Sequence, residues 1–226
     1  NNCYANLRWR LSDGTGKQEP HPAARFASTA PDERKAGGVI MVYESYPWKQ
    51  DLLRRKRLFL KYNTAEQFAK NEDSTYTVLE KAIFYSAFII RKLIDCPGKM
   101  SDEADQYVLH IQKYRPLKKV DILHRWPDED THDWDHPQNV TVKGKDICNW
   151  LIHSYMFFFN FNEEGTIEGF FVTSDYDRNK TLYYIGIKDW LEYMTFIAKD
   201  YVVASDSHYD QGARDYIYTR KERGIL

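Results

Sequence analysis

The stretch from Thr75 to Asp95 constrains the fold more than any other, because it keeps one face apolar over about five helical turns. Cys96, Pro97 and Gly98 follow it and end such a helix, since proline cannot continue a helix and glycine favours its C-terminal cap. The apolar or small residues that recur at helical spacing are Val78, Leu79, Ala82, Ile83, Ser86, Ile89, Ile90 and Leu93. A helix with one such face must pack against other elements.

Three further segments have helical spacing of apolar residues, and two have the composition of strands. The strand segments flank a polar turn at residues 174–180 and predict a β-hairpin. The predicted helices are 48–62, 75–95, 145–159 and 188–203, and the predicted strands are 167–173 and 181–187. The sequence therefore predicts a mainly α protein: a four-helix bundle with a β-hairpin between the third and fourth helices.

The rest of the chain shows weaker patterns. Residues 1–38 are rich in Gly and Pro and predict an irregular N-terminal arm. The bundle domain is expected over residues 39–204, with a long polar insert at 117–142. Residues 103–114 fit either a helix or a strand, and residues 205–226 form a charged C-terminal tail.

Composition narrows the classes of function. The net charge is -1, which excludes a chain that coats nucleic acid by bulk charge, although a local basic face remains open. No run approaches the roughly 18 apolar residues of a membrane helix, and no signal segment opens the chain, so we expect a cytoplasmic protein without membrane contact. Cys3, Cys96 and Cys148 lack CxxC spacing, which argues against a disulfide framework or a zinc knuckle.

The first candidate site lies in the segment 145–159. Asn149 and His153 are four residues apart, so a helix would place an amide and an imidazole on one face. Imidazole can transfer protons near neutral pH, and cleavage of a phosphodiester through a neighbouring hydroxyl needs such a group but no metal. The alternative is a core histidine whose helix serves only for packing.

A polar residue, three variable positions and His on a long helix resemble the motif of the HEPN superfamily (higher eukaryote and prokaryote nucleotide-binding domains). The family motif is Arg, four to six residues, then His, with Asn common after the Arg; Asn149 and His153 match its second and last positions. The four predicted helices would supply the family's bundle. The resemblance implies metal-independent RNA cleavage at a dimeric site, often in toxin–antitoxin or antiviral systems.

One position departs from the family motif. Cys148 stands where the family has Arg, and a thiol cannot supply the charged fork that binds a phosphate. Arg178, in the turn of the predicted hairpin, and Arg91, on the helix 75–95, are the candidates to replace it. If neither does so, Cys148 marks a domain without nuclease activity.

Two charged regions offer other sites. Residues 124–136 contain three His and five acidic residues, and could bind a divalent metal; an acidic solvated loop is the favoured interpretation, so no metal is predicted. The basic clusters 54–57 and 113–119 could follow an RNA backbone or form solvated helix faces.

Together these patterns predict a HEPN-like protein of a bacterial or viral defence system that acts on RNA or a nucleotide without a cofactor. The alternative is a non-catalytic bundle that binds a protein partner or a second copy of itself. The aromatic residues, 15% of the chain, fall largely on the apolar faces of the predicted elements, which indicates a heavily packed and dimeric protein.

Overall fold

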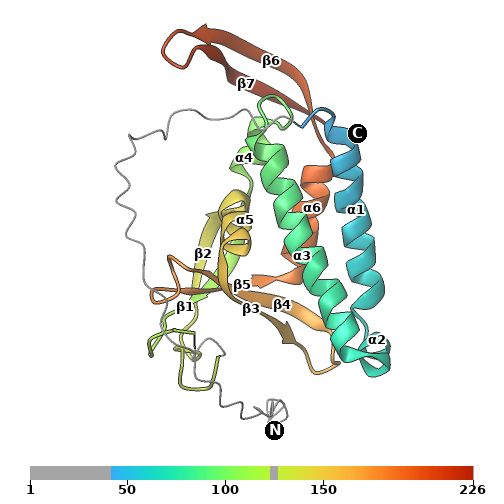
Figure 1. Cartoon of the computed structure of the whole chain (residues 1–226), viewed down its shortest axis with the longest axis vertical. Helices are drawn as coiled ribbons and strands as arrows, with labels where there is room; N and C mark the ends of the chain where they lie inside the picture. Colours follow the sequence, from blue (N-terminus) through green and yellow to red (C-terminus); the bar gives the residue numbers. More distant parts are fainter. Residues whose placement is uncertain (1–41, 123–126, 226) are drawn as a thin grey trace, which may run out of the picture. The chain divides into compact units, whose positions relative to one another are not determined.

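The computed structural model describes residues 42–122 and 127–225 (Figure 1). The arm predicted over residues 1–38 lies outside the described residues. The described part contains a five-stranded antiparallel sheet, six helices and a separate two-stranded hairpin. In chain order these are α1 (Ser45–Tyr62), α2 (Ala65–Lys70), α3 (Glu72–Asp95), α4 (Asp102–Gln106), β1 (Val108–Tyr114), β2 (Gln138–Lys143), α5 (Gly144–Ile152), β3 (Ser154–Phe161), β4 (Ile167–Ser174), β5 (Leu182–Gly186), α6 (Ile187–Ala198), β6 (Asp200–Asp210) and β7 (Asp215–Ile225).

The first long helices follow the sequence patterns closely. Asn71 caps α3 by accepting a hydrogen bond from the Ser74 amide (2.9 Å), and the helix ends at Asp95, two residues before Pro97. This confirms the helix predicted over 75–95. α1 carries Pro47 in its first turn, where a missing amide hydrogen costs nothing. In Figure 1 α1 and α3 run side by side.

The predicted four-helix bundle is wrong, and the segment 145–159 shows why. Only its first part is helical: α5 ends at Ile152, and β3 begins at Ser154. The aromatic residues after His153 favour a strand, because alternation places neighbouring rings on opposite faces of a sheet. Phe157 and Phe159 pack into the core beneath the helices, whereas Phe158 packs on the other face.

The last predicted helix is also shorter than expected. α6 ends at Ala198, and the chain enters β6 at Asp200. Much of the charged segment 205–226 belongs to the hairpin of β6 and β7, which pair antiparallel from Asp200↔Ile225 to Asp210↔Asp215.

The sheet has the strand order β2-β1-β5-β4-β3, and every neighbouring pair is antiparallel. The predicted hairpin is present as the pair β4-β5, but it forms the interior of this sheet and does not interrupt a bundle. One face packs against α1, α3, α5 and α6 through the main core. The other face is covered only in part, by Val120 and Trp134, which pack over Met156, Phe171 and Leu182.

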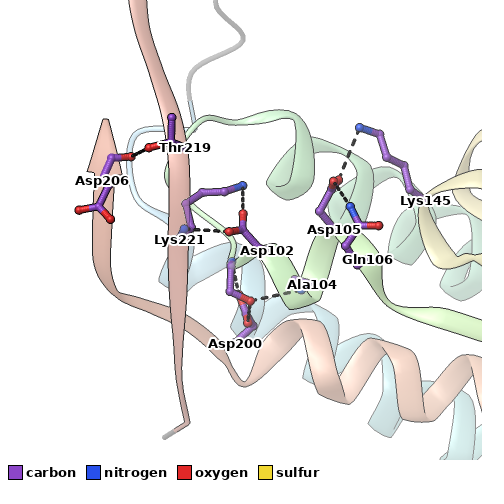
Figure 2. A network of polar contacts seen from close by, with 10 residues as sticks. Asp102, Ala104, Asp105, Gln106, Lys145, Asp200, Asp206, Thr219 and Lys221 are labelled. Carbon is purple, nitrogen blue, oxygen red and sulfur yellow. Dashed lines mark hydrogen bonds and ion pairs between the residues drawn. The ribbon is translucent and has the colours of Figure 1, made fainter. Parts of the chain in front are cut away.

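A buried polar network holds the hairpin β6-β7 to the start of α4. Asp200 is fully buried, and its carboxylate accepts hydrogen bonds from the Ser101 amide (2.9 Å) and hydroxyl (2.5 Å). Arg223 Nε forms an ion pair with the same carboxylate at 3.2 Å. Figure 2 shows Lys221 beside Asp102, whose carboxylate accepts from the Lys221 amide (3.0 Å). A buried carboxylate needs such partners, so these contacts fix the base of the hairpin.

Candidate functional site: a polar groove on the open face of the sheet

A groove of about 380 Å³ lies on the part of the sheet that the helices and the segment around Trp134 leave uncovered. Strands β1, β2 and β5 and the first turn of α6 form it. The side chains and backbone that line it are His110, Ile111, Gln112, Asn139, Val140, Thr141, Tyr184, Gly186 and Asp189. Its size falls at the small end of ligand sites in proteins, which span about 300–1,000 Å³.

Strand register brings the polar side chains together. Gln112 of β1 lies opposite Asn139 of β2 on one side and opposite Tyr184 of β5 on the other. Two residues along β1, His110 lies opposite Thr141, and its Nδ1 is 3.0 Å from the threonine hydroxyl. Because side chains alternate along a strand, these residues share one face of the sheet, while Leu109 and Ile111 enter the core.

Two paired glycines lie on this face of the sheet, and one of them, Gly186, lines the groove. Gly169 of β4 pairs with Gly186 of β5. The Tyr184 ring lies across Gly169, where a β-carbon would come within 2.4 Å of it. Gly186 faces the Asp189 carboxylate, and a β-carbon there would lie 3.0 Å from Asp189 Oδ2. Because Gly169 has no side chain, the Tyr184 ring can lie over it. Because Gly186 has none, the floor of the groove beside Asp189 stays open.

The charges of the groove suit a neutral or cationic ligand. Among the described residues no Lys or Arg lines it, and Asp189 is its acidic side chain. Burial raises the pKa of Tyr184, and a hydrogen bond with Asn160 acts in the opposite direction. The phenol is therefore protonated at neutral pH and can donate a hydrogen bond. The lining offers amides, hydroxyls, an imidazole and a carboxylate around one aromatic ring. Such groups can bind a planar polar molecule through hydrogen bonds to its edges and stacking on its face.

The residues predicted from the sequence lie elsewhere, at the end of α5. Asn149 is half-buried and His153 is exposed, and the His153 amide donates to the Asn149 carbonyl (3.0 Å). The Asp175 amide donates to the His153 carbonyl (3.2 Å), and the Asp175 carboxylate pairs with Arg178 at 3.3 Å. The structure therefore places Arg178 in the turn next to His153, with its guanidinium 4.4 Å from the centre of the Tyr155 ring.

Arg91 belongs to a different environment. It pairs with Asp95 one turn along α3, at 2.6 Å. Its charge acts on Cys148, which lies fully buried on the core side of α5. Burial raises the pKa of the Cys148 thiol far above its ordinary range, and the charge of Arg91 acts in the opposite direction. Cys148 is thus a packing residue, and α5 directs it away from solvent.

In the part of the acidic segment 124–136 that the structure describes, residues 127–136, no cluster of metal ligands is found. His124 lies outside the described residues, and in the described part no three His, Cys, Asp or Glu side chains gather around a common point. His132 is buried, whereas His136 is exposed and pairs with Asp133 (2.8 Å). The acids instead neutralise nearby bases: Asp130 pairs with Lys118, and Asp133 with Arg115 (3.6 Å).

The basic cluster 54–57 is distributed around α1. Arg54 and Arg57 are exposed, whereas Arg55 pairs with Asp51 (3.4 Å) and Lys56 donates to the Thr195 hydroxyl (2.7 Å). No continuous basic surface follows from these contacts.

The groove was not predicted from the sequence, because most of β2 lies in the polar stretch 117–142, which has the composition of an insert. The alternation of Leu109, His110, Ile111 and Gln112 was the available signal for β1. The β-branched run Val140, Thr141 and Val142 was the corresponding signal for β2, but it is only three residues long. Comparisons with protein-family models, with curated proteins and with solved structures gave no match. Within the described residues no helix is long and apolar enough to cross a membrane.

Proposed function

We propose that this protein binds a nucleobase in the sheet groove, either in a free nucleoside or nucleotide or as an unpaired base of RNA. The observation that carries the proposal is the registered row of Asn139, Gln112 and Tyr184 along the groove. Side-chain amides hydrogen-bond to base edges, and aromatic rings stack on unpaired bases. The Asp189 carboxylate is suited to accept hydrogen bonds from the ribose hydroxyls, as carboxylates do in dinucleotide sites.

The groove also argues for binding without cleavage. Lys and Arg side chains commonly stabilise the charge that develops on a transferring phosphoryl group, and neither lines the groove among the described residues. The phosphate of a bound nucleotide would therefore point to solvent. Nucleosides and their monophosphates should bind with similar affinity, which distinguishes this site from a phosphate site.

The test is a titration of the purified protein with the four ribonucleosides, their 5′-monophosphates and an unstructured oligoribonucleotide, followed by calorimetry or ligand-observed NMR. Gln112→Ala removes an amide from the groove and should weaken binding about tenfold, the cost of a lost hydrogen bond near 1.4 kcal/mol. Gly186→Ala adds a methyl group to the floor and should weaken binding as well. Gln138→Ala, which removes an amide at the start of β2 that does not line the groove, is the matched control.

The outcomes separate the ligand sources. Binding of nucleosides supports a free-ligand site, and binding of the oligoribonucleotide alone supports RNA. Failure of all three ligand classes to bind at millimolar concentration would overturn the proposal. So would binding that Gln112→Ala and Gly186→Ala leave unchanged.

Metal-independent RNA cleavage at His153 is the second proposed function. The observation that favours it is the position of Arg178, which shares the Asp175 turn with the exposed His153. It ranks second because the carbonyl end of α5 and the Asp175 carboxylate both repel an anion. His153→Ala and Arg178→Ala should each abolish cleavage and leave the melting temperature unchanged. If the intact protein cleaves no RNA between about pH 5 and about pH 8, where imidazole changes its charge, the nuclease reading fails.

A cytoplasmic location also belongs to this proposal. Cys148 is a free cysteine buried in the core, and free cysteines without a disulfide framework are typical of proteins in reducing compartments.

A further inference from the structure

The sheet ends at β2 in an edge that carries little protection against pairing. β2 pairs with β1 over six consecutive residue pairs without a bulge, and no other described strand lies on its outer side. Half of its backbone amide and carbonyl groups therefore point away from the sheet. Natural edge strands are usually blocked by charges, prolines or bulges. The sequence Gln-Asn-Val-Thr-Val-Lys contains one charge, at its last residue, and no proline.

The opposite edge differs. β3 has two irregularities in its pairing with β4, between Ser154 and Met156 and between Asn160 and Phe161. Bulges of this kind twist a strand and interrupt the regular row of backbone groups that a new strand would need. Of the two edges of the five-stranded sheet, β2 is the one suited to accept another strand.

We propose that β2 pairs antiparallel with β2 of a second copy of this chain, about a two-fold axis at Thr141, to form a continuous ten-stranded sheet. In this register Val140 of each copy faces Val142 of the other on the core side of the sheet. On the open side Thr141 meets Thr141, and Asn139 meets Lys143, whose ammonium can donate to the amide oxygen. No like charges face each other, so the strand is complementary to itself, which a closed two-fold interface requires.

The pairing of two copies would add a wall to the groove on its outer side, beyond β2. Asn139, Val140 and Thr141 line its outer side, where β2 is the last strand. Thr141 of the second copy would stand beside Thr141 and enclose that side, so the two grooves would adjoin across the axis. Dimerisation requires no ligand and is measured in the absence of ligand, so its failure and the failure of base binding are distinguishable.

The test is sedimentation of the full chain over about a hundredfold range of concentration, compared with the chain mass of 26.9 kDa. The intact protein should approach twice this mass. Asn139→Lys places two lysines opposite each other at two symmetric positions and should weaken dimerisation about tenfold. Adding Lys143→Glu to that variant converts both repulsions into attractions and should restore the dimer. This rescue, together with an unchanged melting temperature, excludes misfolding as the cause.

Cysteine cross-linking tests the register between the β2 strands of the two copies. In a Cys3→Ser background, Thr141→Cys should give an intermolecular disulfide on mild oxidation, because directly opposed residues lie within bonding range. Thr219→Cys, exposed on the hairpin, is the control. A protein that is monomeric at every concentration would overturn the proposal. The proposal would also be overturned by a dimer that Asn139→Lys does not weaken and that cross-links through Thr219→Cys. Such a dimer would form through the hairpin.

Discussion

Acidification should destabilise this protein through one buried histidine. His132 is 2% exposed, its Nδ1 lies 3.0 Å from the Thr131 hydroxyl, and its Nε2 has no hydrogen-bond partner among the described residues. Its ring packs against Trp134, 5.2 Å between centroids, beside the residues that cover the sheet. Burial lowers the pKa of His132 from 6.5 to about 4, because the charged ring would lose its hydration without gaining a partner.

The sign of the change in the free energy of unfolding with pH follows from proton linkage. Between the two pKa values the unfolded chain binds a proton that the folded protein does not, so the free energy of unfolding falls as the pH drops below 6.5. With a folded pKa of about 4, the loss is about 2.5 kcal/mol at about pH 4.5 and close to zero at about pH 7.5. The loss stops growing below the folded pKa, where both states are protonated.

Urea unfolding at these two pH values measures the effect. His132→Gln removes the titration, so the variant should lose about 2.5 kcal/mol less than the intact protein between about pH 7.5 and about pH 4.5. Its stability at neutral pH can change for packing reasons, and therefore the pH dependence is the quantity compared. His208→Gln, at an exposed position of β6, is the control. Equal losses in the intact protein and in His132→Gln would refute the reasoning.

Three further predictions concern the packing of the core and of the hairpin. Gly144→Ala would place a β-carbon 2.2 Å from the fully buried Tyr193 ring, so urea unfolding should show a loss of about 3 kcal/mol from overpacking; a stable variant would mean that the ring can move. Tyr193→Phe removes a buried hydroxyl without a hydrogen-bond partner among the described residues, and should leave the free energy of unfolding unchanged or raise it by about 1 kcal/mol. Asp200→Asn replaces the carboxylate that accepts from Ser101 and should cost about 3 kcal/mol, with hydrogen exchange fastest in β6 and β7; uniform protection there would contradict its anchoring role.

Local sequence patterns predicted correctly those elements whose first and last residues are marked by capping or turn residues. The helix over 75–95 has a polar cap and a Pro-Gly stop, and the pair β4-β5 consists of two β-branched and aromatic runs around a polar turn. The segment 145–159 has neither signal at His153. A continuous apolar run fits a buried helix and a buried strand equally well, and only its tertiary contacts decide between them. The bundle, and the helix order behind the HEPN resemblance, depended on that one segment.

The groove could not be predicted for a related reason. Gln112 and Asn139 meet only because β1 and β2 pair in a particular register across the residues that separate them. A shift of one residue would turn every polar side chain of β2 toward the core. That register is fixed by Val140 and Val142, which pack against the core as Leu109 and Ile111 do, and not by any residue of the site itself.

The two paired glycines beside the groove, Gly169 and Gly186, have structural explanations of their own, whereas the row of Asn139, Gln112 and Tyr184 has none. An antiparallel sheet can expose one face to water, so His110 and Thr141 alone need no special explanation. Glycine in a strand costs about 0.5–1 kcal/mol, and neither Gly169 nor Gly186 has the positive φ that would require it. Gly169 is explained by the Tyr184 ring that covers it. Gly186 is the N-cap residue of α6, a position that glycine favours, and a β-carbon there would lie 3.0 Å from the Asp189 carboxylate in the first turn of that helix. The helix start therefore accounts for Gly186, and the row of Asn139, Gln112 and Tyr184 remains the feature that favours a ligand on this face.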